Sequence, residues 1–499
     1  MPIAFRVDCS SKIGSGHLMR CIRLSKSLKK NEKEIYFIIN KSDYLSEIRK
    51  LISKENLNLI LINNKRNNFS YKLDAKSTIK ILKKKKIKKL IVDNYEIDSK
   101  WEKKVKKYTE KLIVIDDLAN RKHYCDIIID QNYVKNYKTR YDKITNKNCL
   151  KLLGPKFCIN NKIKKKSDLN NKSKNTEVRR IFIFFSTVFI PKIFKLIISL
   201  FSAKKYKHIN IDFVVGNLEK KKFLQLKNSI NENINLMINN KNFENLMSKA
   251  DLAIGSGGTN TWERISLGLP SVVFCIAQNQ KEICEFLSKK KIIRYMGLIS
   301  NNSKSKLNRE FIDIQKNYKD IKLNSEENKY LIDGFGKERI NFFINRPIKK
   351  KLELKEINSE DKDLMFGWAN DSLVRKNSFK KKKIKYSDHI KWLKKKIISK
   401  KTLIFKLLLN NIPIGQVRYD KKNNYYEIDY SIDEIFRNYG FGKIIIKKSI
   451  KKIFKKRTII KADVKQENKE SINIFKSLKF RQIKSNSIKK TFELLSNNI

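Results

Sequence analysis

Two glycines and a histidine near the start of the chain have the types and spacing that phosphate chemistry requires. Gly14 and Gly16 follow an alternating apolar run at Ile3–Val7, which predicts a strand, and His17 opens a stretch with helical periodicity. Glycines at such a turn let a phosphate approach the backbone, and the helix start favours an anion. A histidine here reaches whatever the phosphate carries. For Gly-x-Gly alone, the alternative is an ordinary turn with a surface histidine.

A second glycine-rich turn lies near the middle of the chain. Gly258 and Thr259 follow an apolar strand expected at residues 252–254 and lead into a helix that carries Glu263. The turn suits a diphosphate, and Glu263 on the first turns of the helix would hold ribose hydroxyls. The alternative is a plain strand-to-helix turn with Glu263 exposed.

Acidic residues follow several expected strands of the N-terminal region. They are Asp8, the Asp93 of Asp93-Asn94-Tyr95, and the pair Asp116-Asp117. Because ligands bind beyond the carboxyl ends of parallel strands, we expect these residues to rim one cleft. For each aspartate taken singly, the alternative is a cap on the next helix.

The elements that position these residues alternate between strand and helix, which predicts doubly wound parallel sheets with helices on both faces. A polar segment at 160–180 and the run at 346–351 indicate boundaries. We therefore expect three domains, at residues 1–160, 175–345 and 352–499. Strands are expected at residues 3–7, 34–40, 57–62, 89–93, 111–116, 126–130, 180–185, 209–215, 252–254 and 271–276.

The C-terminal 150 residues follow a different pattern, with antiparallel strands expected at 402–409, 414–419 and 426–432. A glycine-rich run, Arg437 to Lys443, then opens a helix. Its bare N–H groups suit a pyrophosphate. A further strand is expected at 458–464, followed by Asn468 and a segment ending in Phe480.

Composition excludes several classes of protein. The 113 basic residues outnumber the acidic ones and give a formal net charge of +63. The excess is mostly lysine spread from end to end, and no nucleic-acid recognition motif stands out, so specific nucleic-acid binding is the lesser alternative. The seven cysteines form no CxxC pair, and the four histidines are too scattered for a metal motif. No signal peptide or membrane span is expected, which points to a reduced, cytoplasmic protein without a metal.

The C-terminal region resembles GNAT acyltransferases. The match rests on Arg437-x-x-Gly440-x-Gly442-Lys443 and on the later segment from Asn468 to Phe480. The resemblance implies an α+β fold and acetyl-CoA as co-substrate, held by Arg437, Gly440, Gly442, Lys443 and Asn468. Two residues depart from the family pattern, because Lys479 replaces a glycine and Phe475 stands where many members have a tyrosine general acid.

The N-terminal region resembles the UDP-2,4-diacetamido-2,4,6-trideoxy-β-L-altropyranose hydrolase of pseudaminic acid synthesis. The matching motifs, which span nearly all of residues 1–300, are Arg6-Val7-Asp8, Ile13-Gly14-Ser15-Gly16-His17, Asp93-Asn94-Tyr95, Gly258-Thr259-Asn260-Thr261-Trp262-Glu263 and Asn279-Gln280. The resemblance implies a two-lobed GT-B-like fold, metal-independent release of UDP by water, and His17 as base. Tyr95 would then contact the sugar, with Glu263 and Asn279 at the UDP. Ser186-Thr187-Val188-Phe189 replaces the usual Gly-Gly-x-Asp.

Together these features predict a bifunctional enzyme that acetylates a UDP-linked 4-amino-6-deoxy sugar and then hydrolyses the UDP-linked product. The residues expected to bind the UDP-sugar are Asp8, Gly14, Gly16, Tyr95, Gly258, Thr259, Glu263 and Asn279, with His17 catalytic. The alternatives are a GT-B glycosyltransferase that carries an acetyltransferase domain, and an acetyltransferase with a degenerate hydrolase domain.

Overall fold

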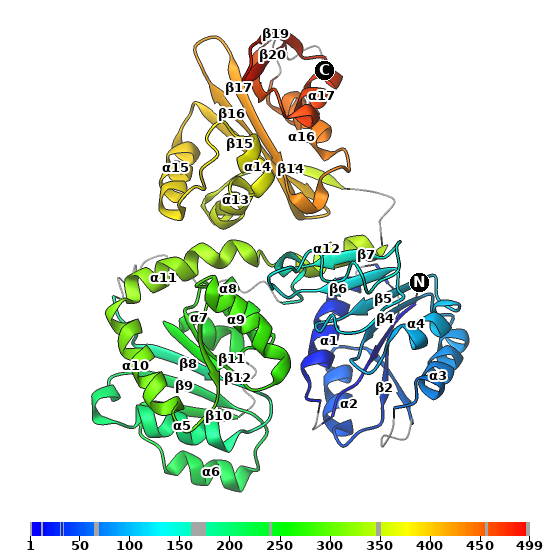
Figure 1. The fold of residues 1–499 in the computed structure, drawn as a ribbon, viewed down its shortest axis with the longest axis vertical. Helices are drawn as coiled ribbons and strands as arrows, with labels where there is room; N and C mark the ends of the chain where they lie inside the picture. Colours follow the sequence, from blue (N-terminus) through cyan, green and yellow to red (C-terminus); the bar gives the residue numbers. More distant parts are fainter. Residues whose placement is uncertain are drawn as a thin grey trace. The chain divides into compact units, whose positions relative to one another are not determined.

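The chain divides into two compact units, residues 1–346 and 347–499. Both are drawn in Figure 1. The computed structural model describes residues 2–10, 13–29, 31–32, 34–63, 69–160, 176–238, 242–345, 351–454 and 458–495. Most of the expected linker at 160–180 and of the boundary at 346–351 lies outside the described residues, so the three domain limits stay a prediction.

The first sheet of the N-terminal unit is parallel, in the order β3-β2-β1-β4-β5-β6-β7. The central strand β4 is buried along its whole length, because Leu90, Ile91 and Val92 lie between helical layers. Helices α3 and α4 cover one face and α1 and α2 the other (Figure 1). The bounds are β1 Ile3–Val7, α1 Gly16–Leu28, β2 Ile35–Asn40, α2 Leu45–Lys54, β3 Asn58–Ile62, α3 Tyr71–Lys84, β4 Lys89–Asp93, α4 Ser99–Lys106, β5 Lys111–Ile115, β6 Ile127–Asp130 and β7 Leu150–Leu153.

The second sheet of this unit is also parallel, in the order β10-β9-β8-β11-β12-β13. Its last helix, α12, returns to the first sheet, where Asn341 Nδ2 donates to the Ser27 carbonyl at 2.8 Å. The bounds are β8 Arg180–Phe184, α5 Pro191–Phe201, β9 Asn210–Val215, α6 Lys220–Asn228, β10 Ile234–Ile238, α7 Phe243–Lys249, β11 Leu252–Ser256, α8 Asn260–Ser266, β12 Ser271–Cys275, α9 Lys281–Lys289, β13 Arg294–Leu298, α10 Ser303–Lys316, α11 Tyr318–Glu327 and α12 Gly336–Asn345.

The C-terminal unit has a mixed sheet in the order β14-β15-β16-β17-β18-β20-β19. Its neighbouring strands are antiparallel except β17 and β18, which are parallel. The bounds are β14 Leu352–Glu356, α13 Lys362–Ala369, α14 Ser372–Asn377, α15 Tyr386–Ile398, β15 Thr402–Leu409, β16 Ile412–Lys421, β17 Tyr426–Ile432, α16 Phe441–Ile453, β18 Ile459–Lys465, α17 Lys469–Ser477, β19 Arg481–Ser485 and β20 Lys489–Leu495.

The expected fold class is confirmed in its architecture: two doubly wound parallel sheets are followed by an α+β unit with a mixed sheet. Six strands were not predicted from the sequence pattern, among them β19, whose residues are all exposed and therefore form no buried apolar run. They are β7, β10, β13, β14, β19 and β20.

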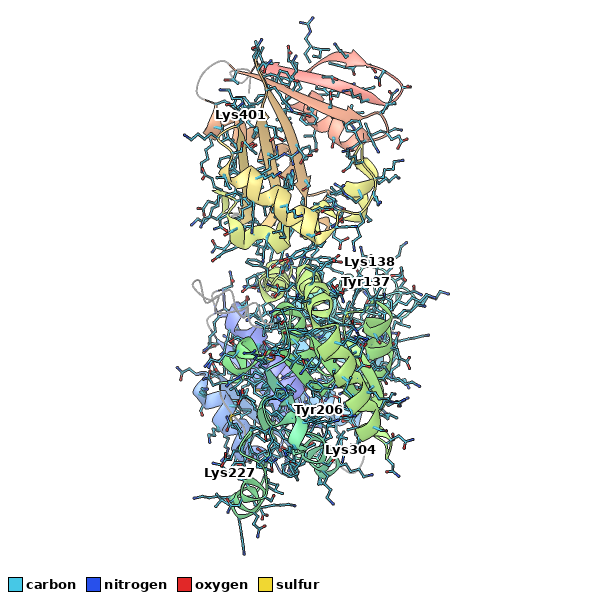
Figure 2. All side chains as sticks on the ribbon, turned by 90° about the vertical axis from the view of Figure 1, so that its left-hand side faces the viewer. Tyr137, Lys138, Tyr206, Lys227, Lys304 and Lys401 are labelled. Atoms are coloured by element: carbon cyan, nitrogen blue, oxygen red, sulfur yellow. The ribbon has the colours of Figure 1, made fainter. Side chains whose placement is uncertain are left out.

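The positive charge is spread over the surface of both units. Figure 2 shows Lys138, Lys227, Lys304 and Lys401, which are exposed and lie far apart in the sequence. Among the described residues, no helix is long and apolar enough to cross a bilayer. In the same part of the chain, no three His, Cys, Asp or Glu side chains gather as metal ligands would. All seven cysteines are buried free thiols.

Candidate active sites

The imidazole of His17 is held by a buried carboxylate. His17 lies in the first turn of α1, and Asp93 ends β4, so the parallel pairing of β1 and β4 brings the two residues together. Asp93 Oδ1 lies 2.6 Å from His17 Nδ1. Since an ionised carboxylate only accepts, we assign the proton to Nδ1, which leaves Nε2 as the acceptor.

Arg20 extends this pair into a network. It lies one turn after His17 on α1, and its guanidinium donates to Asp93 Oδ2 at 2.9 Å and to Oδ1 at 2.7 Å. Its Nη1 also donates to both oxygens of Asp117, at 2.9 and 2.8 Å. Tyr95 Oη donates to Asp117 at 2.9 Å, and its ring meets the His17 ring edge-on at 4.6 Å. A base, a phenol and two carboxylates therefore surround one buried arginine.

The electrostatics of this network keep Asp93 ionised and Tyr95 neutral. Burial alone would raise the pKa of Asp93, but the charge of Arg20 and the hydrogen bonds from His17 and Arg20 outweigh it and hold the pKa well below its usual range. Burial and the neighbouring Asp117 raise the pKa of Tyr95, so Tyr95 remains a neutral phenol at neutral pH. Asp93 is thus a permanent acceptor for the imidazole.

Asp8 lies in the same strand-end region, and neighbouring protein groups hold its carboxylate in place. Its carboxylate accepts from Arg6 at 2.7 and 2.9 Å, from the Asn40 backbone at 2.9 Å and from Asn94 Nδ2 at 2.9 Å. Both of its oxygens are therefore engaged by protein groups. These contacts fix the carboxylate in place, and the expected contact of Asp8 with the substrate stays a prediction.

The first glycine turn is loosely packed at the Cβ positions of its two glycines. Gly14 has φ +78°, and within the described part of the chain no atom lies within 4 Å of a Cβ added to Gly14 or Gly16. Neither glycine is needed for packing, and only Gly14 has a backbone conformation that disfavours other residues. Ser11 and Lys12 of this turn lie outside the described residues.

The second glycine turn is tightly packed against the protein at Gly257 but not at Gly258. A Cβ on Gly257 would lie 2.2 Å from Cys284 Sγ, whereas one on Gly258 would meet only ordinary contacts, 3.7 Å from Ser256. Thr259 is half-buried at the start of α8. Asn279 is exposed on the short helix Gln278–Gln280 that follows β12.

Glu263 is neither exposed nor facing solvent. Its side chain is 3% exposed and forms an ion pair with Arg23 Nη2 at 2.7 Å. Burial raises its pKa even though Arg23 opposes the shift. Arg23 was not among the expected site residues. It lies on α1, six residues after His17, and this position on the same helix is the sequence signal that could have indicated it.

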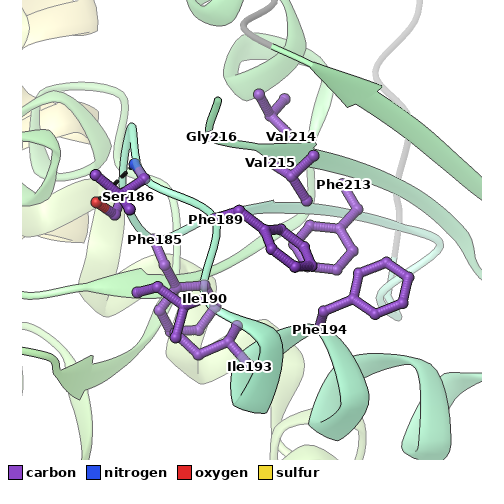
Figure 3. Close-up of a pocket in the computed structure, with 11 residues that line it drawn as sticks. Phe185, Ser186, Phe189, Ile190, Ile193, Phe194, Phe213, Val214, Val215 and Gly216 are labelled. Carbon is purple, nitrogen blue, oxygen red and sulfur yellow. Dashed lines mark hydrogen bonds between the residues drawn. The ribbon is translucent and has the colours of Figure 1, made fainter. Parts of the chain in front are cut away.

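The loop that departs from the hydrolase pattern forms an apolar wall. Phe185, Phe189 and Ile190 line a small pocket together with residues of α5 and β9 (Figure 3). The loop is braced from β9, because Asn217 N donates to the Thr187 carbonyl at 2.8 Å and a Cβ on Gly216 would lie 2.3 Å from Thr187. This strand end therefore carries side chains at the positions where the hydrolase pattern has glycines.

The candidate acetyl-CoA site lies where β17 and β18 part. The two strands pair only at Tyr426 with Ile460 and at Glu427 with Lys461. Beyond these pairs the edge of β17 is open to an extended amide chain, as in strand addition. Gly440 caps α16 with φ +80°, and none of the residues that the structure describes has an atom within 4 Å of a Cβ added there. This geometry fits a pyrophosphate at the helix start.

The other residues expected at this site differ in position. Lys443 is exposed on the first turn of α16. Arg437 is engaged by Asp371 at 2.6 Å and by the Ile432 carbonyl at 3.1 Å. Asn468 caps α17 by accepting from Ser471 N at 3.2 Å. A Cβ on Gly442 would lie 2.8 Å from Ile474, so this glycine serves helix packing as well.

Two sequence families match neighbouring parts of the chain that overlap at residues 351–364. The family described as lipid-A-disaccharide synthetase matches residues 173–364, and the acetyltransferase (GNAT) domain family matches residues 351–481. The C-terminal unit is therefore a GNAT domain.

Two related proteins and one solved structure are similar to larger parts of the chain. The UDP-2,4-diacetamido-2,4,6-trideoxy-beta-L-altropyranose hydrolase of Campylobacter jejuni is 25% identical over 295 residues, which is 58% of this chain and 97% of that protein. An uncharacterised protein of Methanocaldococcus jannaschii is 26% identical over 97% of both chains. The structure of MurG from Acinetobacter baumannii superposes with a TM-score of 0.50 at 10% identity, over 70% of this chain and 100% of that one, which shows the fold alone. The resemblance predicted from sequence is confirmed: a region homologous to the hydrolase, in a GT-B-like fold, precedes a GNAT domain.

Proposed function

We propose that this protein is a bifunctional, cytoplasmic enzyme of pseudaminic acid synthesis. Its GNAT domain transfers an acetyl group from acetyl-CoA to the amine of a UDP-linked 4-amino-6-deoxy sugar. Its N-terminal unit hydrolyses the UDP-2,4-diacetamido-2,4,6-trideoxy sugar to free sugar and UDP. Joining consecutive steps in one chain raises the local concentration of the intermediate.

The observation that carries the hydrolase half is the pairing of His17 with Asp93. With Nδ1 held by Asp93 at 2.6 Å, Nε2 takes a proton from water as the water attacks the anomeric carbon. The bond from that carbon to the diphosphate breaks, and its electron pair leaves with UDP. Gly14, Gly16, Gly258 and Thr259 are the proposed diphosphate contacts.

Sugar recognition belongs in this proposal to Tyr95, and the uridine end to Glu263 and Asn279. Tyr95 supports the role because its ring lies against His17, and its hydroxyl is fixed by Asp117 at 2.9 Å. Asn279 supports it by being exposed beside the second glycine turn. The scheme uses no metal, and we expect chelator-treated protein to keep its hydrolase activity.

The test is to incubate the protein with the UDP-4-amino sugar, with and without acetyl-CoA, and to identify the products by mass spectrometry. We expect the acetylated UDP-sugar and then free sugar with UDP, only when acetyl-CoA is present. His17→Asn should lower hydrolysis by about 10² to 10⁴-fold and leave acetylation intact. His208→Asn, which changes an exposed histidine, is the matched control. Wild-type hydrolysis by His17→Asn would overturn the assignment of the base.

A GT-B glycosyltransferase is the second candidate. It is favoured by the match of residues 173–364 to the lipid-A-disaccharide synthetase family, and by the apolar wall at Phe185 and Phe189. Transfer to an acceptor gives a glycoside, whereas hydrolysis gives free sugar, so the same product analysis separates the two. If only the acetylated UDP-sugar forms, the N-terminal unit is a degenerate hydrolase.

Nucleic-acid binding remains the alternative that the net charge of +63 raises. A DNA binder dominated by phosphate contacts loses affinity steeply with salt. We expect no such slope in a salt titration with DNA, and retention of UDP-sugar binding over the same range.

A further inference from the structure

Two hydroxyl groups meet beside the opening between β17 and β18. Tyr430 lies on β17, three residues beyond the last residue that pairs with β18. Its Oη lies 2.9 Å from Ser471 Oγ, on the first turn of α17. A Cβ on Gly442, in the glycine-rich run, would lie 3.3 Å from the Tyr430 ring. The hydroxyl pair is thus bounded by β17, the start of α16 and the start of α17.

Phe475 lies one turn after Ser471 on α17. It is buried and packs edge-on against Tyr430, with ring centroids 5.8 Å apart. Its other faces meet Phe480 at 4.9 Å and Phe492 at 6.1 Å. This residue has no hydroxyl, so α17 itself supplies no phenol at that point. The phenol nearest to it in this cluster comes from the neighbouring strand.

We propose that the hydroxyl of Tyr430, oriented by Ser471, donates a hydrogen bond to the sulfur that leaves in acetyl transfer. This inference rests on the acetyltransferase half of the proposed function. It assigns to β17 a role that the resemblance places on α17.

The environment suits a donor that keeps its proton. Burial raises the pKa of Tyr430 to about 12, although its hydrogen bond with Ser471 opposes the shift. The phenol is therefore neutral at neutral pH. Because Ser471 Oγ can accept or donate, Tyr430 can offer its proton to sulfur while the serine hydroxyl turns to donate to the phenol oxygen.

The atoms balance as follows. The neutral amine attacks the thioester carbonyl, the C–N bond forms, and the C–S bond breaks with its electron pair going to sulfur. The hydrogen bond from Tyr430 stabilises this developing thiolate. The new ammonium loses one proton to solvent, and the thiolate takes one from solvent, so the products are the amide and the free thiol. A donor aimed at developing charge is worth about 10² to 10³-fold in kcat.

The test compares Tyr430→Phe with Tyr426→Phe, which removes a hydroxyl from the paired end of the same strand. We expect Tyr430→Phe to lower kcat of acetylation about 10²-fold with KM for acetyl-CoA close to the wild-type value. Ser471→Ala should give a smaller loss in kcat. Tyr426→Phe should resemble the wild type in both constants.

A second readout does not depend on the sugar. The thiol of coenzyme A bound to the protein is titrated by the ultraviolet absorbance of its thiolate. A hydrogen bond to sulfur stabilises the thiolate, so the bound thiol should titrate at lower pH in the wild type than in Tyr430→Phe. Equal titration curves would overturn the inference, even if kcat falls, because a packing role alone leaves the thiol unchanged.

The two proposals fail separately. If the wild type transfers no acetyl group to the UDP-amino sugar, the proposed function falls and the thiol titration alone decides the role of Tyr430. If the wild type is active and Tyr430→Phe is equally active, only the role of Tyr430 falls.

Discussion

Asp93 at the end of β4 lies 2.6 Å from Nδ1 of His17 at the start of α1. This contact joins two residues that are far apart in the chain, and it sets which ring nitrogen of His17 remains an acceptor. Asp93→Asn keeps the size of the side chain but allows the amide to donate to the imidazole, which favours the other tautomer.

The first prediction follows from this pair. We expect Asp93→Asn to lower kcat of hydrolysis by about 10² or more, because Nε2 then carries the proton. Release of free sugar from the acetylated UDP-sugar measures the effect, with UDP affinity as the control for binding. Undiminished kcat in a folded variant would contradict the role of Asp93.

Substitutions of the two glycines of the first turn should distinguish an effect on backbone strain from an effect on substrate binding. Gly16→Ala should leave stability unchanged and raise KM for the UDP-sugar, because its Cβ meets no atom of the described residues within 4 Å and lies at the proposed diphosphate site. Gly14→Ala should also lower stability, by about 1 kcal/mol, because φ is +78°. Thermal unfolding and steady-state kinetics measure the two effects. Unchanged KM in Gly16→Ala would place the diphosphate elsewhere.

Substitutions in the ion pair of Glu263 with Arg23 test whether Glu263 contacts ribose or only stabilises the fold. Glu263→Gln should destabilise the N-terminal unit by about 2 kcal/mol, since it leaves Arg23 without its buried partner. If Glu263 also holds ribose hydroxyls, UDP affinity falls in Glu263→Gln but not in Arg23→Gln. Calorimetric titration with UDP distinguishes these outcomes. Wild-type UDP affinity in both variants would remove Glu263 from the site.

The glycines of the GNAT motif should also differ. Gly440→Ala should weaken acetyl-CoA binding, because φ is +80° and the residue lies at the start of α16. Gly442→Ala should in addition lower stability, because its Cβ would lie 2.8 Å from Ile474. Titration with acetyl-CoA and thermal unfolding measure both. Unchanged acetyl-CoA affinity in Gly440→Ala would contradict the pyrophosphate site, and the hydrolase activity of each variant is the internal control.

A buried histidine outside the site should make stability depend on pH. His123 Nδ1 lies 2.7 Å from Glu102, and Nε2 lies 3.8 Å from Asp116. Burial alone would lower the pKa of His123, but these carboxylates outweigh it and raise the pKa to about 9. The unfolded value is about 6.5, so the stabilisation is complete below pH ~6.5 and is lost as pH rises to about 9, with a size on the order of 3 kcal/mol.

Urea unfolding at several pH values tests this dependence. Hydrogen exchange of the β5 amides reports the unfolding of the N-terminal unit. His123→Gln should flatten the profile between pH ~6.5 and ~9, whereas exposed His208→Gln should leave it unchanged. An identical slope in wild type and His123→Gln would show that other groups cause it.

Local pattern in the sequence was sufficient for the fold class and for the turns. Alternating apolar runs become strands and glycines between strand and helix become turns at helix starts, because both depend on residues close together in the chain. The positions of Gly14, Gly258 and Gly440 could be predicted for this reason.

Tertiary structure alone decided which side chains meet. The order of the parallel strands brings Asp93 and Asp117 to Arg20 and His17, and no local spacing specifies that order. Burial of Glu263 against Arg23, and the meeting of Tyr430 with Ser471, likewise depend on how separate elements pack. Sequence periodicity shows that a residue faces a core or a strand end, but a contact between distant residues is fixed only when the sheet and its helices have assembled.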